Sequence, residues 1–408
     1  MTVSTSTPTP TDQARTDQGT GAASAVLVGG LLGLLWAAGL RSWMAQLVGA
    51  GSSFSWLTFV LVLLPGAAVG ALLGRAAHGR PQRTRTARRL ALAPVLFASA
   101  LLDPQIFAAF IHTGEGGGAL MVVLTALSGG FVLGRRRWSV GRVLAVLPAA
   151  CGLLLLTFIG TMAAPVTSPR GAWVCLFGLT FMLVLCVAAA LPYPPPTRVS
   201  TSRHAVRYVA LGGVVGLAWA CALRGFMAEV AGAESGADWV GTFVFILLPG
   251  LLVGGLLGWA AHLRAAGDPR YRRRLALSPL LLSAVLFSDP SDPLAILEDG
   301  VGAGALAVPL IAIAGGYAVC GRGRTLPRAV AGAVALSSVP IWALTATSVG
   351  GPGFALGTPH GLWAAVLYLG LLAALALGAS IPLRHAVGEA RGVRTRAAGR
   401  GPQALSPG

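Results

Sequence analysis

The sequence predicts an all-α polytopic membrane protein with twelve transmembrane helices, arranged as two parallel (same-orientation) six-helix repeats. Three observations predict this fold class: a strongly apolar composition, a series of twelve apolar segments, and an internal duplication. Of the 408 residues, 55% are hydrophobic and only 11% are charged, whereas about 25% of the residues of a soluble domain are charged. The composition therefore argues against both a water-soluble globular fold and a disordered chain.

The apolar segments come first, because they define the helices. Most contain the roughly 20 residues that a helix needs to cross about 30 Å of hydrocarbon. Backbone groups in hydrocarbon must be satisfied internally, so each segment is expected to be helical. The segments lie near residues 24–48, 55–77, 89–111, 116–134, 142–164, 171–192, 208–231, 239–262, 274–297, 301–320, 328–350 and 361–383.

The third and ninth segments are short, since Asp103-Pro104 and Asp289-Pro290 interrupt them. Apolar stretches of that length are compatible with re-entrant segments. The arginines favour a crossing, because both loops that flank segments three and four are basic and belong on one side of the membrane under the positive-inside rule. We therefore expect both short segments to span.

The same rule predicts the topology of the whole chain. All 30 basic residues are arginines, and all but Arg41, Arg170 and Arg224 fall in the tails or in the even-numbered connections. Both termini are therefore expected in the cytoplasm and the protein in the plasma (cytoplasmic) membrane. Residues 1–22 are predicted to be a disordered N-terminal tail, and residues 384–408 a disordered basic C-terminal tail.

The second half of the chain repeats the first. Leu40–Ala45 returns as Leu223–Ala228, Leu63–Gly66 as Leu247–Gly250, and Ser168–Trp173 as Thr358–Trp363. The predicted domains are a first repeat over 23–192, a cytoplasmic linker over 193–207, and a second repeat over 208–383. Because each repeat has six crossings, both enter the membrane from the same side, and such halves are related by an axis along the membrane normal.

A parallel duplication of six helices with a basic loop after the second helix resembles the architecture of the major facilitator superfamily. Gly70 and Arg75 match part of that family's loop motif, but Gly74 stands where the motif has aspartate. In the second half, Gly258-Trp259 lacks both of the motif's charged residues. The resemblance implies an architecture, and we assign no family from it.

Charged residues within the apolar segments are candidate functional positions. Arg41 and Asp103 are about 26 Å and about 21 Å along their helices from the inner side, and Arg224 and Asp289 repeat the arrangement. Charges at such depth are costly and normally have partners. We expect an Arg41–Asp103 pair and an Arg224–Asp289 pair. Each is either a structural tie between helices or, near the outer mouth, a gate or an anion-binding arginine; snorkelling of Arg41 to the outer headgroups is an alternative.

Proline-glycine pairs are the second kind of candidate. Pro65-Gly66 and Pro249-Gly250 lie in the middle of their helices, where each proline removes a backbone donor and favours a kink. Interruptions at matching places of two halves point to the binding site of a transporter, although glycine and proline are also common in membrane helices. Gln46 and Glu229 match one another and are candidate polar residues at an outer mouth, with ordinary interfacial positions as the alternative.

Several function classes have no support in the sequence. It contains no P-loop, HExxH or GxSxG motif, so we expect no enzyme and no cofactor. The cysteines lack metal-binding spacing, so no metal site is expected. The arginines form no separate basic domain, so the expected partner is the lipid bilayer and not nucleic acid.

The leading hypothesis is a secondary transporter with its site between two homologous halves. The alternative is a non-transporting membrane scaffold, or a subunit of a larger membrane complex. The small number of polar residues in the helices favours that alternative, or else an apolar or lipid-like substrate. The sequence does not indicate a substrate, a partner subunit, a coupling ion or an oligomeric state.

Overall fold

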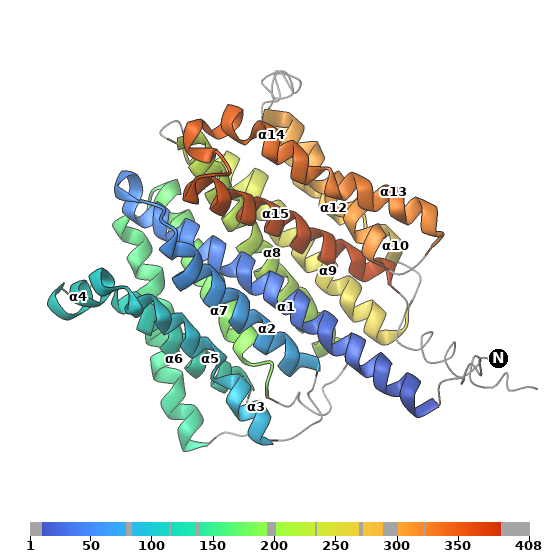
Figure 1. Ribbon diagram of the computed structural model, residues 1–408, viewed down its shortest axis with the longest axis horizontal. Coiled ribbons are helices and arrows are strands. Elements are labelled where there is room, and N and C mark those ends of the chain that lie inside the picture. Colours follow the sequence, from blue (N-terminus) through green and yellow to red (C-terminus); the bar gives the residue numbers. More distant parts are fainter. Residues whose placement is uncertain are drawn as a thin grey trace, which may run out of the picture. The chain divides into compact units, whose positions relative to one another are not determined.

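The computed structural model describes residues 10–78, 84–113, 116–134, 139–193, 201–232, 235–268, 272–288, 301–320 and 323–384 (Figure 1). Every secondary-structure element in these ranges is helical. Contacts divide the chain into two compact units, one of Met1–Thr197 with Gly353–Gly370, the other of Arg198–Pro352 with Leu371–Gly408. The predicted C-terminal tail from residue 385 onward lies outside the described residues, as do residues 1–9 and residues 194–200 of the predicted linker.

The first unit consists of α-helices joined by short 3₁₀ and π segments. Its elements are α1 (Pro10–Val48), η1 (Gly49–Gly51), η2 (Phe59–Leu63), α2 (Leu64–His78), α3 (Thr84–Ala91), η3 (Ala93–Leu102), α4 (Pro104–Thr113), α5 (Gly117–Gly134), α6 (Val140–Ile159), η4 (Gly160–Met162) and α7 (Pro169–Ala189). The part of η8 and α15 between Gly353 and Gly370 also belongs to this unit.

The second unit has a similar order of elements. They are α8 (Thr201–Ala231), η6 (Trp239–Leu247), α9 (Leu248–Ala266), α10 (Arg272–Leu275), η7 (Ser278–Phe287), α12 (Val301–Val319), α13 (Thr325–Leu336), α14 (Ser338–Gly350), η8 (Pro352–Phe354), α15 (Pro359–Ser380) and η9 (Ile381–Leu383). From Leu371 onward, α15 packs in this unit.

Within the described residues, nine helices are long and apolar enough to cross a membrane, or ten if one bent pair is counted as a span. The nine are Gly21–Val48, Phe59–His78, Gly117–Gly134, Val140–Met162, Pro169–Ala189, His204–Ala231, Trp239–Ala266, Thr325–Gly350 and Pro359–Leu383. The chain therefore has the helices of a multi-pass membrane protein. The count of twelve stays a prediction.

The short third segment is not one straight helix. It consists of η3 and α4, which meet at Asp103 with a bend of 90°. Asp103 has extended backbone angles (φ −71°, ψ 119°), because the ring of the following proline disfavours the helical conformation of the residue before it. The ninth and tenth segments are represented by the shorter apolar helices Ser278–Phe287 and Gly304–Val319.

In each unit, two long helices pack against each other through glycines. Figure 1 shows α1 beside α2, and α8 beside α9. A Cβ built on Gly70 would lie 2.1 Å from the carbonyl oxygen of Gly29, and one on Gly254 would lie 2.2 Å from that of Gly212. Only residues without side chains permit such an approach of two backbones, as in other membrane helix pairs.

The predicted proline interruptions appear as π-helical turns. The π segments η2 and η6 run directly into Leu-Pro-Gly, with Pro65 and Pro249 as the second residues of α2 and α9. A proline has no N–H to donate, so the hydrogen-bonding register changes at this point. In the first unit, Ser99 Oγ of η3 donates to the carbonyl of Leu61, four residues before Pro65 (3.2 Å). This hydrogen bond links η3 to the π segment that precedes Pro65.

Candidate functional site: an apolar pocket in the second unit

The second unit contains a pocket with a volume of about 290 Å³. Its wall comes from α8, α9, η7 and the C-terminal part of α15 with η9. The residues that line it are Tyr208, Leu211, Gly212, Val215, Gly216, Trp219, Gly250, Val253, Gly254, Leu257, Gly258, Ala261, Leu282, Ala374, Leu375, Gly378 and Ile381. No charged side chain is among them, so the pocket suits an apolar ligand.

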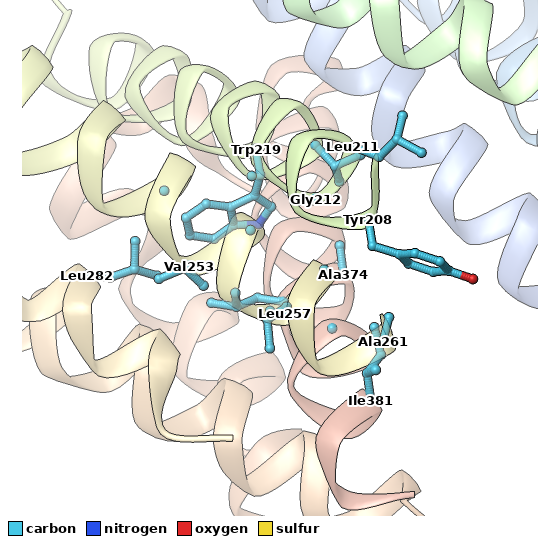
Figure 2. A pocket seen from close by; sticks show the side chains of 17 residues that line it. Tyr208, Leu211, Gly212, Trp219, Val253, Leu257, Ala261, Leu282, Ala374 and Ile381 are labelled. Carbon is cyan, nitrogen blue, oxygen red and sulfur yellow. The ribbon is translucent and has the colours of Figure 1, made fainter. Parts of the chain in front are cut away.

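The pocket is elongated along α8. Figure 2 shows Tyr208, Ala261 and Ile381 at one end, and Trp219, Val253 and Leu282 at the other. Tyr208 and Trp219 are eleven residues apart on α8, which corresponds to about 16 Å at the α-helical rise. We refer to these ends as the Tyr208 end and the Trp219 end.

Small residues make room for the pocket. The glycines that bring α8 and α9 together also line it, because they carry no side chain that would fill the groove. On α15, a Cβ built on Gly378 would lie only 3.0 Å from Leu257 Cδ1. The deeper wall belongs to a buried hydrophobic cluster that includes Val253, Leu257, Leu282 and Leu375.

The Trp219 end has a fixed geometry. Trp219 Nε1 donates a hydrogen bond of 2.9 Å to the carbonyl of Leu371 on α15, so its N–H is already satisfied by the protein. The indole packs against the hydrophobic cluster and closes this end with an apolar surface.

Aromatic rings occupy the corresponding region of the first unit. Trp36, the match of Trp219, donates from Nε1 to the carbonyl of Phe181 (2.9 Å). Its ring centroid lies 5.0 Å from that of Phe97 and 6.0 Å from that of Phe181. In the register that aligns Pro94 with Pro279, Phe97 corresponds to Leu282. A bulky ring thus stands in the first unit where the pocket wall of the second unit has a leucine.

Of the predicted kink residues, Gly250 lines the pocket. Pro249 is buried next to it in α9, and Pro65 and Gly66 are buried in α2. A Cβ built on Gly66 would lie 2.3 Å from Cβ of Ala37, so this glycine serves the contact between α1 and α2. Whether these residues act in a transport site stays a prediction.

The two intramembrane arginines are buried and contact the connection that follows their own helix. Arg41 (8% exposed) donates from Nη2 to Ser52 Oγ (3.1 Å) and to the carbonyl of Ser53 (2.5 Å). Its guanidinium also lies 4.0 Å from the ring centroid of Phe54, a cation–π arrangement. These contacts tie the end of α1 to the chain that leads into α2.

Arg224 repeats these contacts in the second unit. It is 6% exposed and donates from Nη1 to Ser235 Oγ (3.2 Å) and from Nη2 to the carbonyl of Gly236. The spacing between arginine and serine is eleven residues in both units. The serine partners were missed at the sequence level, although their repetition after matching helices was a readable signal.

The predicted partner of Arg41 has a local role. An oxygen of Asp103 accepts a hydrogen bond from the backbone N–H of Gln105 (2.9 Å) at the start of α4. The pairing of Arg41 with Asp103 stays a prediction. Asp289 lies outside the described residues, so its pairing with Arg224 does too.

The two candidate polar residues of an outer mouth lie near the C-terminal ends of α1 and α8. Gln46 is buried (8% exposed) and Glu229 is half-buried. Neither lines the pocket described above. Their role at a mouth stays a prediction.

In the part of the chain that the structure describes, no group of three or more His, Cys, Asp or Glu side chains could hold a metal ion. No protein-family model, curated protein or solved structure matches this chain.

Proposed function

We propose that the chain is a secondary transporter of an apolar or lipid-like substrate, built from twelve transmembrane helices in two duplicated halves. The observation that carries the proposal is the apolar pocket of the second unit. The apolar helices fit a multi-pass membrane protein, and an apolar pocket in such a protein suits a ligand that dissolves in the bilayer.

Matched contacts support the duplication. In each unit, a tryptophan indole on the first long helix donates to a backbone carbonyl of α7 or α15. In each unit, an arginine eleven residues before a serine donates to that serine. Side-chain roles that recur at matching positions are expected if both halves descend from one six-helix unit.

The interrupted helices support a transport role. The pocket contacts α9 just after the π segment that ends at Leu247, and it contacts the 3₁₀ helix η7. Interrupted helices at matching places of two halves are typical of transporter binding sites. The distribution of arginines in the sequence further supports a plasma-membrane protein with both termini in the cytoplasm.

Reconstitution tests this proposal. Proteoliposomes would contain a phospholipid with a nitrobenzoxadiazole-labelled acyl chain in both leaflets, and dithionite outside would bleach labels that reach the outer leaflet. The rate would be measured with and without an imposed pH gradient. We expect the wild-type chain to expose inner-leaflet label faster than empty vesicles do, and Leu282→Phe, which places a ring in the pocket, to abolish the difference.

Phe97→Leu is the matched control, because it changes the corresponding position of the first unit and leaves the pocket intact. If the wild-type chain exposes label no faster than empty vesicles do, with or without the gradient, the transporter proposal fails. The alternative of a membrane scaffold, or a subunit of a larger complex, would then replace it.

A further inference from the structure

We propose that the pocket of the second unit holds one acyl chain of an anionic phospholipid, with the lipid phosphate at the arginines of the Tyr208 end. This inference rests on the proposed function, since it uses the same pocket. It adds the class of ligand, its orientation, and the residues that recognise its headgroup.

The shape of the pocket fits a single chain. Its length of about 16 Å combines with a volume of about 290 Å³, which is at the small end of the range for small-molecule pockets. Its wall offers hydrocarbon along its whole length, as the interior of a bilayer does. A long, narrow and apolar ligand satisfies these conditions better than a compact polar one.

The pocket is open to the outside of the protein. Val215 lines it and is 52% exposed, and Tyr208 is 37% exposed. Both side chains belong to a helix long and apolar enough to cross the bilayer, and in the proposed arrangement Val215 would lie at the depth of the lipid chains and Tyr208 near the headgroups. A lipid can therefore insert one chain sideways without passing through water.

Positive charge gathers at the Tyr208 end. Arg207 precedes Tyr208 on α8 and is exposed, and Arg274 on α10 is exposed next to η9, which carries the pocket residue Ile381. Arg264 and Arg384 are half-buried, three residues beyond the pocket residues Ala261 and Ile381 respectively. The Trp219 end of the pocket lies farther along α8, against the buried hydrophobic cluster.

The charge at this end remains positive when its acidic group is included. Asp268 lies just past the end of α9 and is half-buried. Among the described residues at this end of the pocket, it is the acidic one. His262 packs beside Tyr208, with ring centroids 5.9 Å apart. Basic pockets between membrane helices on the cytoplasmic side bind anionic lipid headgroups, and arginine suits phosphate because of its forked donors.

The packing around the matching tryptophans differs between the two units. In the first unit, Phe97 and Phe181 pack against Trp36. In the register that aligns Trp173 with Trp363, two pocket residues of α15 are smaller than their matches in α7: Ala374 corresponds to Val184 and Gly378 to Ala188. Smaller side chains at these positions leave space beside α8 and α9.

Native mass spectrometry of the purified, delipidated full-length chain tests the inference. The probes are phosphatidylglycerol and phosphatidylcholine with identical acyl chains, added at equal concentrations. We expect one phosphatidylglycerol to be retained at least tenfold more than phosphatidylcholine. Leu282→Phe should remove retention of both lipids, because it blocks the acyl chain.

Charge variants separate the headgroup from the pocket. Arg207→Gln and Arg274→Gln should each lower phosphatidylglycerol retention about fivefold, at about 1 kcal/mol per arginine, and leave phosphatidylcholine unchanged. Arg170→Gln, which removes an exposed arginine of the first unit, is the matched control and should have no effect. Phe97→Leu controls for the ring substitution.

The outcomes distinguish this inference from the proposed function. If both lipids are retained equally, or if Arg170→Gln matches the two other arginine variants, the anionic-lipid inference is wrong while the apolar pocket remains a site. If Leu282→Phe retains both lipids like the wild type, the pocket holds no lipid chain, and the proposed function loses its basis as well.

Discussion

The contact between α8 and α9 allows a sharp test at two adjacent glycines. A Cβ on Gly254 would lie 2.2 Å from the carbonyl oxygen of Gly212 and 2.7 Å from the Cα of Gly216. A Cβ on Gly255 would lie no closer than 3.6 Å to Val209. The two positions share a helix and a sequence neighbourhood, but only one faces a backbone.

The expected difference follows from the geometry. Carbon–oxygen contacts in proteins lie at about 3.3–3.6 Å, so Gly254→Ala requires the two helices to separate by about 1 Å. Overpacking of this kind costs about 1–3 kcal/mol. Both substitutions bring the same gain in helix propensity, about 1 kcal/mol, which cancels in the comparison. We expect Gly254→Ala to be less stable than Gly255→Ala by about 1–3 kcal/mol.

The assay is unfolding by sodium dodecyl sulfate in mixed micelles, followed by tryptophan fluorescence. The first unit offers a second pair for the same measurement: Gly70→Ala meets the carbonyl of Gly29 at 2.1 Å, whereas Gly30→Ala has 3.6 Å of space. Equal unfolding midpoints for Gly254→Ala and Gly255→Ala would refute the close backbone approach.

Three further predictions use the same unfolding assay or hydrogen exchange. Phe97→Leu should lower the free energy of unfolding by about 1–2 kcal/mol, because it removes the ring beside Trp36 and leaves a void; an unchanged midpoint would contradict the packing. Arg41→Ala should cost about 1–3 kcal/mol in the same assay, because it removes the hydrogen bonds to Ser52 and Ser53 and the contact with the Phe54 ring; an unchanged midpoint would argue against these contacts. Asp103→Ala should weaken the start of α4 by about 0.5–2 kcal/mol, seen as faster amide exchange at Gln105, whereas Asp103→Asn keeps the acceptor and should preserve it; identical exchange in both variants would speak against the cap.

Much of the helical framework could be predicted from hydropathy. The sixth segment was expected near 171–192, and α7 covers Pro169–Ala189; the seventh was expected near 208–231, and the span runs over His204–Ala231. These agreements arise because a run of about 20 apolar residues has few alternatives to a helix in hydrocarbon. The proline-glycine pairs predicted kinks in the middle of two helices, and the structure has π segments directly before them.

The side-chain contacts that form the candidate site could not be predicted from the sequence. Asp103 was interpreted as an ion partner because of its depth, yet its position before a proline also suits a local cap. The pocket depends on whether Leu282 or a larger residue packs beside Trp219, a difference of volume between two hydrophobic residues. A hydropathy scale treats leucine and a larger hydrophobic residue as similarly apolar. The space of the pocket therefore becomes visible only in the three-dimensional packing of the side chains.

The wall of the pocket includes the ten-residue 3₁₀ helix η7, and this segment would become shorter if it rewound as an α-helix. A 3₁₀ segment rises about 2.0 Å per residue and an α-helix about 1.5 Å, so the same ten residues would shorten by about 5 Å on converting to α. Each residue would also turn by about 20° less about the axis, which amounts to about 80° at Leu282, four residues from Ser278. A change of hydrogen-bonding partner along one short segment would therefore swing a pocket residue away from Trp219, and the volume available to a ligand would depend on the winding of a single helix.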